Sequence, residues 1–440
     1  MHEPHFDGLR TYADDAARQP DFAVIRQRAA RVRRHRRRAT ASSVAVVIAA
    51  LVATSLGYAV TGGPQIAAPT PSPSVDPDTG WPRVTSVVAT GPADLYAVVE
   101  RCRDCGPELY ASDDAGATWL RRSVPPTADS AAPSPSAVIV PLGRGVLAWQ
   151  QLRVVSLKEL EPSRSPQVSP SAEPADGAPS PSATDRLWTT VDEGRTWRRA
   201  VVEPEPVATV PAGTRPVDCR FVGQPSPCQL YTVNPASGRF APLAHQPTGI
   251  TVQDWWTGQT NIPLGAHLWV PGVDPVTNKP AIAASSDRGR TWRTHVFTAG
   301  VPATVNHGRI AGMYLPTVAA DAGGTAYALI RRDDNVQDPY RTTDGGTTWL
   351  PLPGGAVADV PGPGFVTADG AHVLLSDQGL RVNRDGSRYQ PMRLPGCPAE
   401  LTQLGAITPS HQAAGRYLIF SDQRICLSDD GWTWRTVTVP

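Results

Sequence analysis

One eight-residue pattern recurs down the chain and restricts its fold more than any other feature. It reads Ser/Thr-x-Asp-x-Gly-x-Thr-Trp, with complete copies beginning at Ser112, Thr190, Ser285 and Thr342. A fifth copy, Asp429-Asp430-Gly431-Trp432-Thr433-Trp434, has Leu427 where the first Ser/Thr is expected. The fixed positions of the five copies are Ser112, Asp114, Gly116 and Trp119; Thr190, Asp192, Gly194 and Trp197; Ser285, Asp287, Gly289 and Trp292; Thr342, Asp344, Gly346 and Trp349; and Asp429, Gly431 and Trp434.

The pattern has a direct physical interpretation. An Asp carboxylate and a Ser/Thr hydroxyl accept backbone N–H groups within a tight turn. The Gly supplies a positive φ that other residues resist. The Thr-Trp pair favours a strand whose large ring packs between layers. Each copy therefore predicts a strand, a locked turn and a second strand.

Two degenerate copies fill the gaps between the complete ones. The stretch 230–240 has Asn234 in place of Asp and Phe240 in place of Trp, and the stretch 379–389 has Asp385 and ends in Tyr389. The seven anchors are then spaced by 78, 42, 53, 57, 41 and 44 residues. Four-stranded propeller blades repeat at about 40–50 residues. The spacing predicts seven blades, or six if one degenerate copy is accidental.

The recurring pattern resembles the Asp-box, or BNR, repeat of sialidases and related β-propellers. The resemblance is confined to the repeats. It implies an all-β propeller with blades of four antiparallel strands, and it implies a fold and not an activity.

The N-terminal part has a different composition. Residues 1–38 hold ten Arg and five acidic residues, whereas residues 39–75 carry no charge, and 43–60 are almost wholly apolar. An Arg run of this kind could bind nucleic acid. Its position just before an apolar stretch long enough to cross a bilayer favours a topology signal instead. We predict a cytoplasmic Arg-rich segment (1–38) and a transmembrane helix (39–61).

The apolar stretch is interpreted as a retained signal anchor, because 38 residues precede it and no small-residue cleavage site follows it. A Pro/Ser/Thr-rich stalk (62–80) then leads to the propeller (81–440). Two Pro/Ser-rich insertions, 125–136 and 161–185, are predicted to be disordered and explain the longest spacing. The predicted location is the cell membrane, with one span and an extracytoplasmic propeller.

All six cysteines lie in the predicted extracytoplasmic part. An even number there indicates disulfides, although the sequence allows 15 pairings. Pairing neighbours along the chain gives Cys102–Cys105, Cys219–Cys228 and Cys397–Cys426. The Cys102-x-x-Cys105 motif could also be redox-active or half of a zinc site, but no further ligands stand at zinc spacing.

Catalytic residues of the sialidase type do not transfer to this chain. Sialidases carry an Arg triad whose first member lies in a Phe/Tyr-Arg-Ile-Pro motif, an Asp acid/base, and a Tyr nucleophile paired with a Glu. No Arg-Ile-Pro is present, and no Glu occurs between Glu205 and Glu400. Four other carboxylates near strand ends, Asp94, Asp254, Asp321 and Asp359, are better explained as turn formers.

One aromatic cluster lies outside the repeats. Trp255 and Trp256, with Trp269 downstream, could stack on a sugar or a partner, or could pack in the core of blade four. No metal, phosphate or cofactor motif accompanies them, so we predict no cofactor.

Together these features predict a membrane-anchored, extracytoplasmic Asp-box propeller that acts as a non-catalytic binding or assembly module for a protein or glycan ligand. The alternative is an exo-α-sialidase-like glycoside hydrolase with an unfamiliar site.

Overall fold

The computed structural model describes residues 81–440, apart from 103–104, 127–135, 153–186, 226, 254–255, 299–314, 333–335, 355, 359, 361, 377–378, 385, 387, 399–409, 414, 422–423 and 440. The predicted cytoplasmic segment, transmembrane helix and stalk lie outside these residues, as do nearly all of the two predicted insertions. No helix within the described residues is long and apolar enough to cross a membrane.

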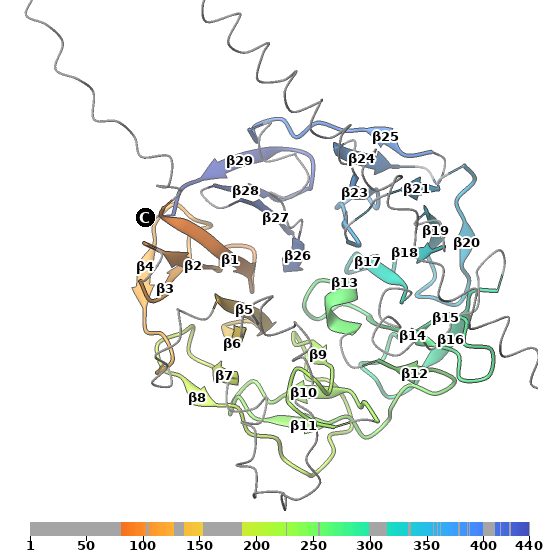
Figure 1. Ribbon diagram of the computed structural model, residues 1–440, viewed down its shortest axis with the longest axis horizontal. Helices are drawn as coiled ribbons and strands as arrows, with labels where there is room; N and C mark the ends of the chain where they lie inside the picture. Colours follow the sequence, from red (N-terminus) through yellow and green to blue (C-terminus); the bar gives the residue numbers. More distant parts are fainter. Residues whose placement is uncertain are drawn as a thin grey trace, which may run out of the picture. The chain divides into compact units, whose positions relative to one another are not determined.

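The prediction of an all-β propeller with seven blades is confirmed. Seven sheets follow one another around a ring, and their strands run antiparallel with one exception described below (Figure 1). Blade 1 contains β1 (Arg83–Ala89), β2 (Leu95–Glu100), β3 (Glu108–Ser112) and β4 (Leu120–Arg122). Blade 2 contains β5 (Ser136–Gly143), β6 (Val146–Leu152), β7 (Leu187–Thr190) and β8 (Arg198–Arg199). Blade 3 contains β9 (Pro216–Val217), β10 (Tyr231–Val233) and β11 (Phe240–Pro242).

The remaining blades follow in chain order. Blade 4 contains β12 (Thr251–Val252), β14 (Leu268–Val273), β15 (Pro280–Ser285) and β16 (Arg293–Val296). Blade 5 contains β17 (Thr317–Ala320), β18 (Ala326–Arg331), β19 (Val336–Thr342) and β20 (Leu350–Pro351), with β13 (Thr260–Asn261) and β21 (Val357–Ala358) added. Blade 6 contains β22 (Phe365–Val366), β23 (His372–Ser376), β24 (Gly379–Asn383) and β25 (Gln390–Pro391). Blade 7 contains β26 (Ser410–Ala413), β27 (Arg416–Phe420), β28 (Ile425–Ser428) and β29 (Trp434–Val437).

Blade 3 departs from the predicted four strands, because its described sheet has three. The chain beside β11 makes two isolated parallel bridges, Val202 with Phe240 and Val207 with Leu243. Pro204 and Pro206 lie between these bridges. Since proline has no N–H to donate, this segment cannot form a continuous ladder.

The ring closes by side-chain packing, because blades 1 and 7 each have four strands of their own. Val84 and Leu95 of blade 1 pack in one core cluster with Leu418 and Leu427 of blade 7. The buried Arg416 on β27 donates from Nε to the backbone oxygen of Pro92 in blade 1, at 2.6 Å. Apolar burial and this hydrogen bond therefore join the first blade to the last.

The complete repeats form turns with one hydrogen-bond pattern. In blade 1 the Ser112 hydroxyl donates to Asp114 Oδ1 and accepts the Gly116 N–H, at 2.8 and 2.7 Å. Asp114 also accepts the Thr118 hydroxyl and amide, at 2.6 and 2.8 Å. These hydrogen bonds, led by the one from the Thr118 hydroxyl, lower the pKa of Asp114 to about 2. The carboxylate is therefore charged at neutral pH and holds the turn as an acceptor. The copies anchored by Asp192, Asp287 and Asp344 repeat this pattern.

The glycine of each turn contacts the preceding blade. Gly289 in blade 4 has a φ of 85°, and a β-carbon at this position would lie 2.6 Å from Leu243 of blade 3. The corresponding contacts are Gly116 with Val437, Gly194 with Leu109, Gly346 with Ala284 and Gly431 with Thr367. Each contact joins a blade to the one before it around the ring. The glycine is needed both for its backbone conformation and for this close approach.

The repeat tryptophans also reach the preceding blade. Trp197 donates from Nε1 to the backbone oxygen of Ser123, and Trp292 donates to that of His245, at 2.9 and 2.8 Å. The Trp349 ring lies 5.6 Å from Trp269 of blade 4, edge to face. Each repeat therefore stabilises its own turn and one side of an interface between blades.

Asp429 was the wrong anchor for the fifth copy. The Ser428 hydroxyl donates to Asp430 Oδ1 at 2.9 Å, and Asp430 accepts the amides of Trp432 and Thr433. Asp429 instead pairs with Arg416 at 2.5 Å. The turn has lost the residue between Asp and Gly, so the alignment by Asp-x-Gly was shifted by one position. In blade 6 the described anchor is Asn383, whose side-chain oxygen accepts the Gly386 N–H, and Asp385 is outside the described residues.

The three predicted disulfides are confirmed. Cys102–Cys105 closes a short loop after β2, and Cys219–Cys228 lies in blade 3. Cys397–Cys426 joins the segment after β25 to β28 of blade 7. All six cysteines are paired, so Cys102 and Cys105 offer no free thiolates to a zinc ion in this oxidised state.

A buried histidine joins blades 5 and 6. His372 stacks on Tyr327, with ring centroids 4.6 Å apart, and its Nε2 lies 2.7 Å from the Pro363 carbonyl oxygen. A carbonyl only accepts, so Nε2 carries the proton and Nδ1 accepts the Tyr389 hydroxyl, at 2.6 Å. Burial lowers the pKa of His372 to about 4. The imidazole is therefore neutral in the folded protein near pH 7.

We expect Gly289→Ala to lower the free energy of unfolding by about 2–4 kcal/mol, because it combines left-handed backbone strain with overpacking against Leu243. Gly370→Ala is the matched control, since Gly370 has a φ of 83° and open space around it. The control should lose about 1 kcal/mol from backbone strain alone. Urea unfolding measures both values, and equal losses would contradict the proposed contact between blades.

We expect His372 to make stability depend on pH. Its pKa is about 4 in the folded protein against 6.5 for an unperturbed histidine, so the unfolded chain binds more protons between these values. The contribution of His372 to the free energy of unfolding is complete above pH 6.5 and decreases as the pH falls toward 4. Between pH 7.5 and 5 the free energy of unfolding should fall by about 2 kcal/mol for this reason. The Gln side chain of His372→Gln cannot titrate, so urea unfolding of this variant should show a smaller loss of free energy of unfolding between pH 7.5 and 5. A loss equal to that of the unaltered protein would contradict the assignment of His372 as a buried neutral imidazole.

Candidate functional site

A segment of blade 4 lies inside the ring. The 3₁₀ helix η3 (Trp256–Gln259) and β13 leave blade 4 between β12 and β14 and reach the centre (Figure 1). Strand β13 pairs with β17 of blade 5, and this pairing is the parallel exception in the propeller. The Asn261 side chain donates to the Gly364 carbonyl oxygen before β22. We call residues 256–267 the inner segment.

The inner segment is also tied to blade 3. Asp218 is 2% exposed and accepts the hydroxyl and the amide of Thr257, at 2.5 and 3.4 Å. It also accepts the Phe221 N–H at 2.8 Å. A buried carboxylate is therefore used to fix the inner segment, and its hydrogen bonds account for its burial.

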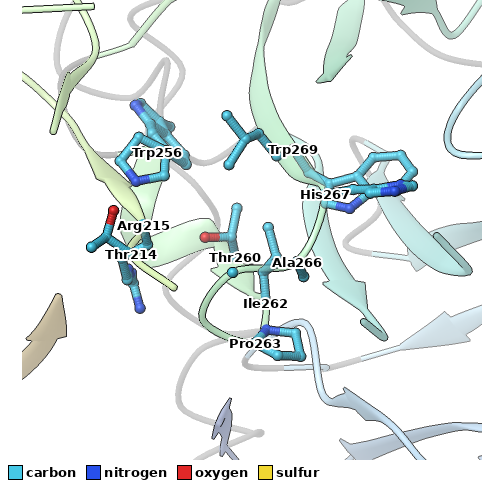
Figure 2. A pocket seen from close by; sticks show the side chains of 12 residues that line it. Thr214, Arg215, Trp256, Thr260, Ile262, Pro263, Ala266, His267 and Trp269 are labelled. Carbon is cyan, nitrogen blue, oxygen red and sulfur yellow. The ribbon is translucent and has the colours of Figure 1, made fainter. Parts of the chain in front are cut away.

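A cavity beside the inner segment is too small for a ligand. Its volume is about 20 Å³, which suits a single water molecule. Trp256 lies on one side of it, and Trp269 and His267 lie on the opposite side (Figure 2). Trp256 is 2% exposed and packs with Leu268 and other core residues of blade 4, so it is not available for ligand stacking. Trp255 lies outside the described residues.

Of the four carboxylates that the sequence offers near strand ends, the two that the structure describes, Asp94 and Asp321, are each used in a local contact. Asp94 lies 3.3 Å from Arg144 Nε of blade 2. Asp321 accepts the amides of Gly323 and Thr325 in a turn, at 2.8 and 2.9 Å. Asp254 and Asp359 lie outside the described residues. Within the described part of the propeller, no three His, Cys, Asp or Glu side chains are grouped as a metal site would require.

A groove at the rim, between blades 6 and 7, has more of the properties of a binding site. Its volume is about 550 Å³, within the range of roughly 300–1,000 Å³ typical of ligand sites. Blade 6 supplies one wall, and the shortened turn of blade 7 supplies the other. We call it the Trp432 groove; it is lined by Asp369, Val382, Arg384, Pro391, Met392, Arg393, Pro395, Trp432 and Thr433.

The shortened turn positions Trp432. Asp430 accepts the Trp432 amide at 2.7 Å, and Gly431 packs against Thr367 of blade 6. The indole Nε1 then donates to Asp369 Oδ1 at 3.1 Å. The Trp432 side chain is half-buried, so part of the ring remains accessible from the groove.

An arginine is held against the same ring. The Arg384 guanidinium carbon lies 4.0 Å from the Trp432 ring centroid, which is a close cation–π contact. Arg393 lines the groove beside it. No carboxylate of the described residues forms an ion pair with either guanidinium. The groove therefore offers two cationic groups, one of them held in place.

Asp369 supports the ring without neutralising the groove. Its partial burial raises its pKa, but hydrogen bonds from Thr367 and Trp432 outweigh this, and the pKa lies below the usual value. The carboxylate is ionised at neutral pH, and its Oδ1 is used by both donors. Two guanidiniums against one carboxylate leave a net charge of +1 on the lining.

Sequence reasoning missed this groove, although one signal was present. At the position before the repeat's Thr-Trp, the other copies have Ala117, Arg195, Arg290 and Thr347, and blade 7 has Trp432. A large aromatic side chain in an otherwise exposed turn is typical of binding sites. Its partners Asp369, Arg384 and Arg393 lie on another blade, and the pattern alone does not connect them.

No protein-family model matches the chain, and neither does any curated protein. Solved structures with a similar fold include YCF48 bound to D1 peptide, at 12% identity over 81% of this chain and 82% of that chain, with a TM-score of 0.27. A GH74 xyloglucanase from Xanthomonas campestris is 14% identical over 82% of this chain and 49% of its own, with a TM-score of 0.31. PorZ, a surface component of the type-IX secretion system of Porphyromonas gingivalis, is 9% identical over 82% and 38%, with a TM-score of 0.39. The chain thus spans half or less of the latter two proteins, and these low similarities give no information about the site.

We expect two tryptophans two residues apart to respond differently to truncation. Trp434 is 4% exposed and packs against Phe365, so Trp434→Ala should lower the free energy of unfolding by about 3–5 kcal/mol. Trp432→Ala removes a half-buried ring from the groove and should cost about 1 kcal/mol or less. Urea unfolding compares the two, and a loss at Trp432 as large as at Trp434 would mean that Trp432 belongs to the core.

Proposed function

We propose that this chain is a membrane-anchored, extracytoplasmic propeller of the Asp-box type that binds a partner protein through the Trp432 groove and carries out no catalysis. The observation that carries the proposal is the groove itself, where Arg384 and Arg393 lie beside an accessible ring without a described carboxylate partner. Cationic and aromatic side chains of this kind dominate binding energy at protein interfaces.

The Asp-box assignment is supported by the hydrogen bonds of the repeated turns. The hydroxyl, the carboxylate and the positive-φ glycine each have the role that the sequence pattern requires. The same turns place their tryptophans between blades, away from the ring centre. The repeats therefore account for the fold and leave the function to other residues.

The proposed location depends on the N-terminal sequence and on the cysteines. Ten Arg precede an apolar run of about 18–20 residues, which suits a membrane span with the N-terminus in the cytoplasm. Three disulfides fit an oxidising compartment outside the cytoplasm. A propeller held at the membrane surface would meet partners that are also exported or anchored there.

The absence of catalysis is supported by the ring centre. The inner segment lies where a substrate funnel would be needed, and the buried carboxylate beside it, Asp218 of blade 3, accepts hydrogen bonds from Thr257 and Phe221. The half-buried Arg215 lines the small cavity beside it and not a site of ligand size.

Photo-crosslinking in intact cells tests the proposal. A benzophenone amino acid replaces Thr433, which is exposed in the groove, or Val276, which is 86% exposed on blade 4. We expect a discrete protein adduct from position 433 and none from position 276. The 433 adduct should also disappear when Trp432→Ala is added.

Two results would contradict the proposal. One is a set of adducts that does not differ between positions 433 and 276. The other is hydrolysis of a fluorogenic sialoside by the purified full-length protein, with an authentic sialidase as the positive control, because turnover would require a site that the proposal lacks.

A further inference from the structure

The chemistry of the Trp432 groove restricts what it can bind. This inference rests on the proposed function and specifies the ligand of the same site. Arg384 is exposed, yet its guanidinium is positioned by the Trp432 ring at 4.0 Å, and that ring is positioned by Asp369. A guanidinium held in this way loses less side-chain entropy when a ligand pairs with it.

The positive charge in the groove favours an anionic ligand. A guanidinium can hold a carboxylate by two parallel hydrogen bonds. Arg393 is also exposed and lines the groove together with Arg384. Asp369, the carboxylate in the lining, already accepts hydrogen bonds from Thr367 and Trp432. A ligand carboxylate can therefore pair with the guanidiniums without displacing an ion pair among the described residues.

The rest of the lining is apolar. Pro391, Met392 and Pro395 lie in the groove with the Trp432 ring, and Met392 is half-buried. Proline has no N–H, and methionine has only a weakly accepting sulfur, so their side chains offer little to the hydroxyls of a sugar. Methionine adapts its shape to apolar side chains of different size. This combination favours a peptide over a sulfated glycan.

We propose that the Trp432 groove binds an extended acidic peptide segment of the partner, with an Asp or Glu carboxylate at Arg384 and Arg393 and a neighbouring apolar side chain against Met392 and the exposed part of Trp432. The charged residue gives orientation, and the apolar residue adds buried area. Because both guanidiniums are exposed, added salt weakens the complex.

Fluorescence anisotropy with the full-length protein tests this proposal. The probe is a fluorescein-labelled octapeptide of alternating Glu and Leu, and the comparison peptides replace every Glu by Gln or every Leu by Ser. We expect the Glu-Leu peptide to bind at least tenfold more tightly than either. Raising NaCl from 50 to 500 mM should weaken the binding of the Glu-Leu peptide.

Variants of the protein locate the binding. Arg384→Gln combined with Arg393→Gln should weaken the Glu-Leu peptide about tenfold. Arg198→Gln, an exposed position on blade 2, is the matched control and should leave its affinity unchanged. Circular dichroism and the urea midpoint confirm that the double variant is folded.

Three results would overturn the proposal that the groove binds an acidic peptide. They are equal binding of the Gln-Leu peptide, unchanged affinity of the double variant, and tighter binding of a labelled heparin tetrasaccharide than of the Glu-Leu peptide. None of them would abolish the crosslink from position 433 in cells. Failure of the ligand class is therefore distinguished from failure of the protein-binding function.

Discussion

The contact between each turn glycine and the preceding blade is the constraint on which the ring depends. A β-carbon at Gly116, Gly194, Gly289, Gly346 or Gly431 would lie 2.6–2.8 Å from a side chain of the preceding blade. The Asp and Ser/Thr hydrogen bonds that hold the turn thus also set the distance between neighbouring blades. Blades 1 and 7 use the same contact, through Gly116 and Val437, so the ring closes without exchanging a strand.

The candidate site is formed by a shortened version of this turn in blade 7. In blade 7 the residue between Asp and Gly is absent, and the complete copies have a positive φ at that residue, as at Ala115 and Arg288. The shorter turn keeps the glycine contact, here with Thr367, and the next residue is Trp432. Because Thr367 and Asp369 share one turn of blade 6, the packing contact and the hydrogen bond to the indole occur side by side. The groove thus lies beside an interface that keeps the glycine contact found between the other blades.

The fold could be predicted because its determinants are local and repeated. Turn residues at fixed offsets, repeated at blade spacing, define the strands, and neighbouring cysteines pair within the same part of the ring. The site could not be predicted, because the residues that contact Trp432 lie far from it in the sequence. Asp369, which accepts its hydrogen bond, is 63 residues away, and Arg384, which stacks on its ring, is 48 residues away. The shift from Asp429 to Asp430 has a different, local origin, because a one-residue deletion moves the alignment of the turn and leaves its residue types unchanged. The sequence around Trp256 also allows ligand stacking, but its side chain lies in a core cluster with residues of β14 and β15 and with Leu230 and Leu243 of blade 3.

The ring centre and the rim differ in how far an amino-acid substitution would disturb the rest of the propeller. The inner segment is fixed at three points, to blade 3 through Asp218, to blade 5 through β13 and to blade 6 through Asn261. A substitution there disturbs several blades at once, and a buried polar group left unpaired is costly. At the rim, each turn is held by its own Asp carboxylate, glycine and Ser/Thr hydroxyl. The side chain of the residue after the glycine is not needed for this hydrogen-bond pattern. A large side chain at that rim position therefore leaves the turn and the contact between blades intact, and Trp432 occupies it.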